Sequence, residues 1–201
     1  FKDTVTTTGN GAVTIDNAGV LTIDNGANFS LDGAFAQIST ADTGSVSLGG
    51  NITTTNDAIG FAEGVTLTNG VTLNTGTGAG NITFSSTVDA TTAGTETLVL
   101  TAGTGDITFT GIVGATRLGA VTINQAAGVT ISQAFSATSF NQPVGTMGTG
   151  IFTLNGDLDT DVGGVTISTA TVDLNANIAT TAGGTSGLVT INAGSGGVNL
   201  A

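Results

Sequence analysis

The sequence predicts an all-β chain that forms a single parallel β-solenoid over residues 1–201, with essentially no helix. Three observations lead to this prediction: a recurring apolar–polar–apolar triplet, turn-forming residues between the triplets, and a longer repeat of roughly 20–25 residues. A repeat of that length gives roughly 8–10 coils. At about 4.8 Å per coil, the rod is expected to be on the order of 45 Å long.

The triplets mark the expected strands. Val, Ile, Leu or Phe occupies the two outer positions, and the middle residue is usually Thr. This alternation is typical of a strand with one buried face, so we expect the outer residues to point inward and the middle residue to face solvent. The triplets are VTI at 13–15, LTI at 21–23, FSL at 29–31, VSL at 46–48, VTL at 65–67 and 71–73, ITF at 82–84 and 107–109, VTI at 121–123, 129–131, 165–167 and 189–191, FTL at 152–154, VDL at 172–174 and VNL at 198–200.

The spacing of the triplets favours a solenoid over other all-β folds. Val13, Leu21 and Phe29 begin triplets that are 8 residues apart, which leaves only a few Gly, Asn, Asp, Ala or Ser residues for each turn. Antiparallel sandwiches and barrels usually have strands of about five to six residues or more. Three-residue strands with Gly and Asn corners instead suit a coil built from short parallel strands.

A longer and degenerate repeat supports the same prediction. VSLGGNITTT at 46–55 matches FTLNGDLDTD at 152–161 and VDLNANIATT at 172–181. Such loose similarity is expected where each coil is constrained only by its inward shape and its corners.

The remaining expectations concern core, corners and one irregular segment. The Asn residues that precede apolar residues, Asn51, Asn81 and Asn177, are expected to satisfy corner backbone groups or to stack as ladders. Residues 136–150, which include Gln142 and Pro143, lack triplets and are expected to form a protruding loop or an irregular coil. The nine Phe residues are expected in the core: Phe1, Phe29, Phe35, Phe61, Phe84, Phe109, Phe135, Phe140 and Phe152.

Composition excludes several classes of function. The chain has no Cys and no His, so it has no disulfide, no thiolate or imidazole metal site and no triad with an imidazole base. Lys2 and Arg117 are the only basic residues against a net charge of −12, which argues against nucleic-acid binding. No apolar run approaches the roughly 18 residues of a membrane span, so we expect no membrane insertion. No cofactor is expected.

One acidic motif is a candidate cation site. Asp157, Asp159 and Asp161 alternate along one strand face, and three carboxylates on one face could bind Ca²⁺. The motif departs from an EF-hand loop, because Ser168 stands where a bidentate Glu belongs. The alternative is a solvated acidic strand and corner, and the sequence leaves both readings open.

An enzyme is not expected. Some parallel β-helices cleave polysaccharides with paired carboxylates, and Asp157 and Asp159 could form such a pair. One Arg, one Lys, no His and no aromatic platform for a sugar argue against it.

Several long strings carry a resemblance to a known group of proteins. GAVTIDNAGVLTI at 11–23, LTAGTGDITFTGIVGATRLGAVTI at 100–123 and FTLNGDLDTDVGGVTI at 152–167 resemble the repeats of filamentous-haemagglutinin-like and β-strand-repeat surface proteins of bacteria. The resemblance implies a right-handed parallel β-helix and an extracellular, structural or adhesive role at the cell surface. It implies no catalytic residues and no particular receptor.

The expected function is an extracellular rod that forms part of a surface filament, sheath or adhesin stalk. The strand-like TVTTT at 4–8 and the triplet at 198–200 predict ends without caps, and such ends favour head-to-tail contacts with copies of the chain or with flanking repeats. The alternative is a binding module whose lateral face recognises a surface glycan or ice, although ordinary β propensity also explains the outward Thr residues. These are Thr14, Thr22, Thr66, Thr72, Thr83, Thr108, Thr122, Thr130, Thr166 and Thr190.

Overall fold

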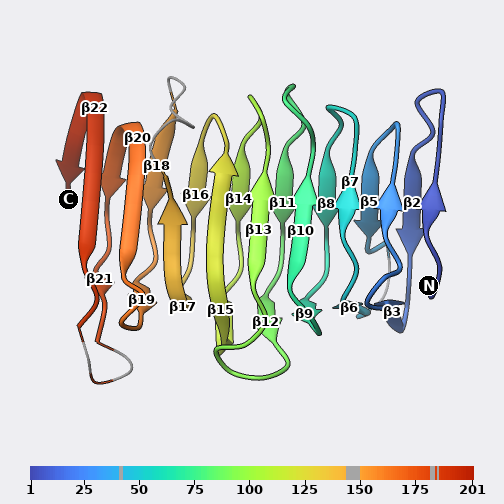
Figure 1. Ribbon diagram of the computed structural model, residues 1–201, viewed down its shortest axis with the longest axis horizontal. Helices are drawn as coiled ribbons and strands as arrows, with labels where there is room; N and C mark the ends of the chain where they lie inside the picture. Colours follow the sequence, from blue (N-terminus) through green and yellow to red (C-terminus); the bar gives the residue numbers. More distant parts are fainter. Residues whose placement is uncertain (41–42, 144–149, 182–183, 185) are drawn as a thin grey trace.

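The computed structural model is a parallel β-solenoid, as the sequence predicts. It describes residues 1–40, 43–143, 150–181, 184 and 186–201. Its 22 strands pair in parallel with strands of the neighbouring coils, and the coils lie side by side along the long axis with the termini at opposite ends (Figure 1). The described residues contain no helix, and therefore none that is long and apolar enough to cross a membrane.

The strands form three stacks, here called the first, second and third faces in the order in which each coil visits them. The first face begins with five short strands and continues in parts of four long ones. These strands are β1 (Val5–Thr6), β4 (Phe29–Ser30), β7 (Ile52–Thr53), β10 (Val71–Asn74), β13 (Leu98–Thr101), the second part of β15 (Val113–Gln125), the second part of β17 (Phe135–Gln142), and the first parts of β20 (Val165–Leu174) and β22 (Val189–Leu200).

The second face has the most regular register. Its first inward residue in each coil pairs directly with the equivalent residue of the next, from Val13 through Phe35 and Ile59 to Val198, and the coils measured this way have 20 to 26 residues. The face comprises β2 (Val13–Asp16), β5 (Phe35–Ile38), β8 (Ile59–Phe61), β11 (Ile82–Phe84), β14 (Ile107–Phe109), β16 (Val129–Ile131), β18 (Ile151–Leu154) and the second parts of β20 and β22.

The third face closes each coil. It comprises β3 (Val20–Ile23), β6 (Ser45–Leu48), β9 (Val65–Leu67), β12 (Val88–Ala90), the first parts of β15 and β17, β19 (Leu158–Thr160) and β21 (Ile178–Ala179). The register of the second face gives eight coil-to-coil steps, in line with the predicted number of coils.

The inward residues of the strands make the core. All fifteen triplets lie on strands, except that Leu31 follows the last residue of β4, and away from the end coils their outer residues are buried, as predicted. Eight of the nine Phe side chains are almost fully buried; Phe1 is the exception, at 49% exposed. Successive Phe rings contact one another from Phe1 to Phe152, with centroids 5.1 to 5.6 Å apart. The Phe rings therefore run as a continuous line through most of the core.

Corner Asn side chains accept backbone hydrogen bonds from the coil that follows, as predicted. The Asn51 Oδ1 accepts from the Thr72 backbone N–H at 2.7 Å, and the Asn81 Oδ1 accepts from the Asp106 N–H at 2.8 Å. Asn177 has the reverse role, because its backbone N–H and its side-chain amide both donate to the Asp157 Oδ1 of the preceding coil. These bonds pair corner groups that the sheets leave without partners.

The expectation for residues 136–150 is wrong in its first half. Residues 136–142 belong to β17, which runs without a break from the third face to the first. The sequence did not predict this strand because Ala137 and Gln142 occupy inward positions that hold large apolar residues in the triplets. Residues 144–149 lie outside the described part of the chain.

Candidate functional site

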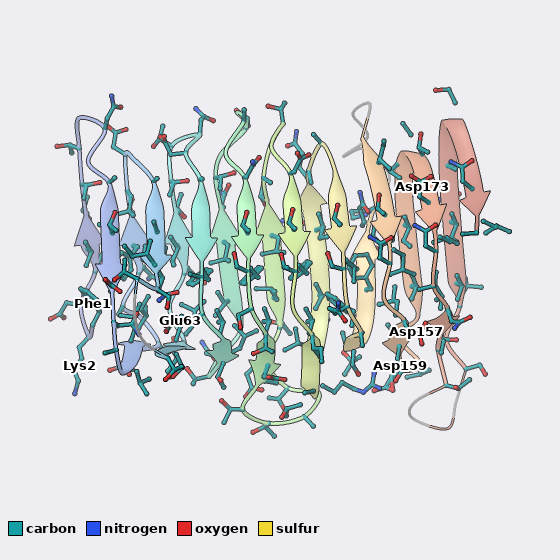
Figure 2. All side chains as sticks on the ribbon, turned by 180° about the vertical axis from the view of Figure 1, so that it is seen from behind. Phe1, Lys2, Glu63, Asp157, Asp159 and Asp173 are labelled. Atoms are coloured by element: carbon teal, nitrogen blue, oxygen red, sulfur yellow. The ribbon has the colours of Figure 1, made fainter. Side chains whose placement is uncertain are left out.

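The acidic motif does not form a ligand set. Asp157 precedes β19 and accepts the two hydrogen bonds from Asn177, whereas Asp159, in β19, forms an ion pair with Arg117. One carboxylate oxygen of Asp161 is buried without a hydrogen-bond partner. Figure 2 shows Asp157 and Asp159 on the same side of the rod. Among the described residues, no group of three or more acidic side chains is placed to hold a metal ion.

Arg117 joins three successive coils. From β15, its Nη1 donates to the Ala137 carbonyl at 2.7 Å and to the Asp159 carbonyl at 3.1 Å, while its Nη2 contacts the Asp159 carboxylate at 2.5 Å. Sequence reasoning missed this contact. The separation of 42 residues between Arg117 and Asp159 is about two coil lengths, and that spacing is the signal that could have paired them.

A buried polar cluster lies near the N-terminal end, where Figure 2 labels Glu63. The Glu63 Oε1 accepts from the Gly44 N–H at 2.8 Å, and its Oε2 is buried without a hydrogen-bond partner. The Gln37 Oε1 accepts from the backbone N–H groups of Ala62 and Glu63, and its Nε2 donates to the Asn17 Oδ1 at 2.9 Å. The cluster ties three consecutive coils together through groups that are distant in sequence, which is why the sequence did not reveal it.

A shallow groove of about 450 Å³ lies on the outer surface of the second face. Thr108, Thr130 and Thr153 form its floor, one residue per coil, and Asp106 and Asp173 also border it. The ten Thr residues predicted to face outward are all exposed or half-buried, so that prediction is confirmed. On this face a single file of Thr residues runs over four consecutive strands, through Thr83, Thr108, Thr130 and Thr153, and does not form a broad grid. The equivalent positions of other coils are Ala36, Gly60, Asp173 and Asn199.

The N-terminal end of the rod presents apolar side chains. The Phe1 amino group donates to the Thr22 carbonyl at 2.6 Å, and the Asp24 N–H donates to the Phe1 carbonyl at 3.0 Å. This pair of bonds places Phe1 beside Ile23 in the manner of a parallel strand. Its ring packs on Phe29 and remains half exposed at the end of the rod, where Figure 2 shows it beside Lys2.

The C-terminal end presents a larger apolar surface with a hollow. Leu188 and Leu200 are each 77% exposed, and Val189 and Val198 are also exposed. The hollow has a volume of about 540 Å³, and its apolar lining is formed by Leu174, Ala176, Ile178, Val189, Ile191, Leu200 and Ala201. Inward positions that are covered by the next coil elsewhere are thus uncovered here.

The two ends of the rod expose apolar side chains beside the edges of strands. Among the described residues, the outermost strands have no neighbouring strand on one side, and exposed apolar side chains lie next to them. Such an edge can pair with another strand and bury its apolar residues at the same time.

Compared with known proteins, the chain matches no protein family, no curated protein and no solved structure.

Proposed function

We propose that the protein is an extracellular structural component: a β-helical rod that stacks head to tail into a surface filament or sheath, or forms part of an adhesin stalk. The observation that carries the proposal is the uninterrupted stack of parallel coils, which gives a rod with a continuous apolar core and mainly polar faces. Outward Thr, Asn and Asp residues cover most of the faces, where Ile112, Ile151 and Val162 are exposed apolar exceptions. The proposal includes no catalytic activity.

Net charge supports end-to-end contact over lateral contact. The charge of −12 makes parallel rods repel one another along their sides. Extracellular location rests on the repeat resemblance and on the scarcity of charged residues in the sequence.

The experiment is sedimentation velocity and negative-stain microscopy of the 201-residue chain over a wide range of concentrations. We expect oligomers and filaments one rod wide, which form faster at 0.15 M salt than at 0.01 M because the Debye length falls from about 30 to about 8 Å. A chain that stays monomeric at millimolar concentration and at both salt concentrations would contradict the stacking.

The second candidate function is recognition by the lateral surface. The groove bordered by Asp106, Asp173 and the row of Thr hydroxyls favours a polyhydroxylated ligand such as a surface glycan, or ice. A glycan array and a thermal-hysteresis measurement test it. Substituting Thr130 by Val should abolish either signal, and an unchanged signal would remove the groove from consideration.

A further inference from the structure

A small pocket lies where the second face turns into the third, at the turns that follow β5, β8 and β11. This corner pocket has a volume of about 250 Å³ and is lined by Ser39, Thr43 and Gly44 of the first turn, by 62–64 of the second and by Ser86 of the third. Pockets that hold drug-sized ligands measure roughly 300–1,000 Å³, so the corner pocket suits a smaller group.

Unequal turn lengths explain why a glutamate is buried in the wall of the corner pocket. Six residues, 39–44, separate β5 from β6, whereas three residues separate β8 from β9 and β11 from β12. Glu63 is the middle residue of a three-residue turn, and its Oε1 accepts from the Gly44 N–H of the longer turn at 2.8 Å. The carboxylate is thus held against the preceding coil, and Glu63 is only 7% exposed.

The neighbouring side-chain amides have no donor left for this carboxylate. The Gln37 Nε2 donates to the Asn17 Oδ1 and to the Ile38 carbonyl, both at 2.9 Å, and the Asn17 Nδ2 donates to two backbone carbonyls. A side-chain amide has two N–H donors, so both groups are fully used. The Glu63 Oε2 is accordingly buried without a hydrogen-bond partner.

The Glu63 carboxylate also has no cationic partner in the part of the chain that the structure describes. The one ion pair there joins Arg117 to Asp159, and Lys2, the other basic residue, is exposed. An unpaired charge is costly to bury, and a neutral donor satisfies the oxygen without balancing the charge. The group that meets both needs carries N–H donors together with a positive charge.

We propose that the corner pocket binds a primary ammonium group, with the Glu63 carboxylate as its counter-charge and the hydroxyl oxygens of Thr43 and Ser86 as further acceptors. An alkylammonium has three N–H donors around one compact charge, which matches this set of acceptors. Ca²⁺ fits less well, because it takes 6–8 oxygen ligands, usually with several carboxylates, and Glu63 is the only acidic residue among the described lining. The site goes beyond the proposed structural role and does not depend on assembly of the rods.

The experiment is an NMR titration of the full ¹⁵N-labelled chain with n-butylammonium chloride at pH 7, at a protein concentration below that at which filaments form. We expect saturable shifts of the Gly44, Glu63 and Gly64 amide signals, with a dissociation constant of about 1 mM. Tetramethylammonium chloride is the matched ligand, because it has the same charge and no N–H donor, and it should give no saturable shift. Equal responses to the two salts would overturn the proposal.

Two carboxylate variants test the counter-charge. Glu63→Gln should weaken butylammonium binding at least tenfold, whereas Glu96→Gln neutralises an equally buried carboxylate outside the pocket and should leave binding unchanged. Circular dichroism should show that both variants keep the fold of the parent. Unweakened binding by folded Glu63→Gln would refute the role of the carboxylate.

A third variant tests the pocket with the charge intact. A Cβ on Gly64 would lie 3.0 Å from the Thr87 Oγ1 and 4.0 Å from the Ser86 Oγ, so Gly64→Ala should narrow the pocket and weaken binding. Gly60→Ala is the control, because its Cβ meets nothing within 4 Å. Unchanged binding by Gly64→Ala would place the ammonium outside the corner pocket.

The source of the ammonium group is tested with a short acetylated peptide that has one central lysine, compared with the same peptide containing norleucine. Binding of butylammonium and of the lysine peptide would assign the pocket to a lysine side chain of another protein. Binding of butylammonium alone would assign it to a small free amine. No saturable binding of either probe would overturn the proposal.

Discussion

Single side chains hold neighbouring coils in register through polar contacts across the turns. Arg117 reaches two coils beyond its own, Gln37 and Glu63 join three coils, and corner Asn residues bond to the next coil. The apolar core side chains alone could pack in more than one register. These polar contacts fix the register between coils, because a shift by one residue would break each of them.

Removing the Arg117 side chain should reduce stability. We expect Arg117→Ala to lower the free energy of unfolding by about 1–2 kcal/mol, mainly through the lost hydrogen bonds to the carbonyls of Ala137 and Asp159. The ion pair contributes less, because its carboxylate is 42% exposed and screened by water. Asp159→Asn is the control and should lose less than Arg117→Ala in urea unfolding. A larger loss for Asp159→Asn would mean that the ion pair dominates.

Neutralising Glu63 should increase stability. Its Oε2 is a buried carboxylate oxygen without a hydrogen-bond partner. The Asn17 carbonyl oxygen lies near it, because both oxygens are within 2.3 Å of the position that a Cβ on Gly44 would occupy. The amide of Glu63→Gln is less costly to bury and can donate to that carbonyl, so we expect a gain of about 1 kcal/mol.

Glu96→Gln is the matched control for this change. Glu96 is equally buried, but its Oε2 already accepts a hydrogen bond from the Thr92 N–H at 3.0 Å. Urea unfolding should therefore show a gain for Glu63→Gln and none for Glu96→Gln. A loss of stability in Glu63→Gln would show that the carboxylate has a partner that the amide cannot replace.

At the scale of strands, glycine permits the sharp change of direction in β15. Gly114 has φ of 73°, and a Cβ there would lie 2.0 Å from the Ser136 carbonyl oxygen of the next coil. Gly114→Ala should therefore destabilise the fold by more than about 2 kcal/mol. Gly60→Ala is the control, because its Cβ meets nothing within 4 Å and its φ is not positive. It should be neutral or stabilising in thermal unfolding; similar losses from both changes would contradict the strain argument.

The stacked rings of β8, β11 and β14 should be the least replaceable part of the core. Phe84 lies between Phe61 and Phe109, with interplanar angles of 7° and 3°. We expect Phe84→Ala to cost about 3–5 kcal/mol, because the cavity lies between two layers that cannot close, and Phe84→Leu to cost less. Denaturant unfolding measures both. Equal costs would show that the stack adds nothing beyond apolar burial.

The sequence predicted most strands in which large apolar residues at both inward positions flank a polar residue. It missed β8 and β13, where Gly60 and Val99 stand between the inward residues. It also missed strands with a smaller or polar residue at an inward position, namely β5, β12, β19 and most of β17, and the two-residue strands β7 and β21. In these strands the stacking of neighbouring coils imposes the conformation, and the local pattern is too weak to reveal it. The contacts of Glu63 could not be predicted, because coils that vary from 20 to 26 residues do not fix which residues become neighbours. For Arg117 and Asp159 the separation of 42 residues, about two coil lengths, was the only signal in the sequence.

At the scale of the whole molecule, the core consists mainly of apolar side chains, and we therefore expect the fold to be stable without metal. We expect the melting temperature to be the same in chelator and in millimolar Ca²⁺, as measured by differential scanning calorimetry. A rise of more than about 2–4 °C with Ca²⁺ would correspond to about 1 kcal/mol of binding free energy. It would restore Asp157, Asp159 and Asp161 as a cation site.

The stacking of short parallel strands also determines how the rod responds to tension along its axis. Its interstrand hydrogen bonds run along that axis, so a pulling force loads one coil boundary at a time, and coils detach singly from the ends. Eight steps of about 4.8 Å make a rod of about 40 Å, whereas 201 extended residues span about 680 Å. The chain can therefore lengthen roughly seventeen-fold under load, and each detached coil absorbs mechanical work before the backbone itself is stretched.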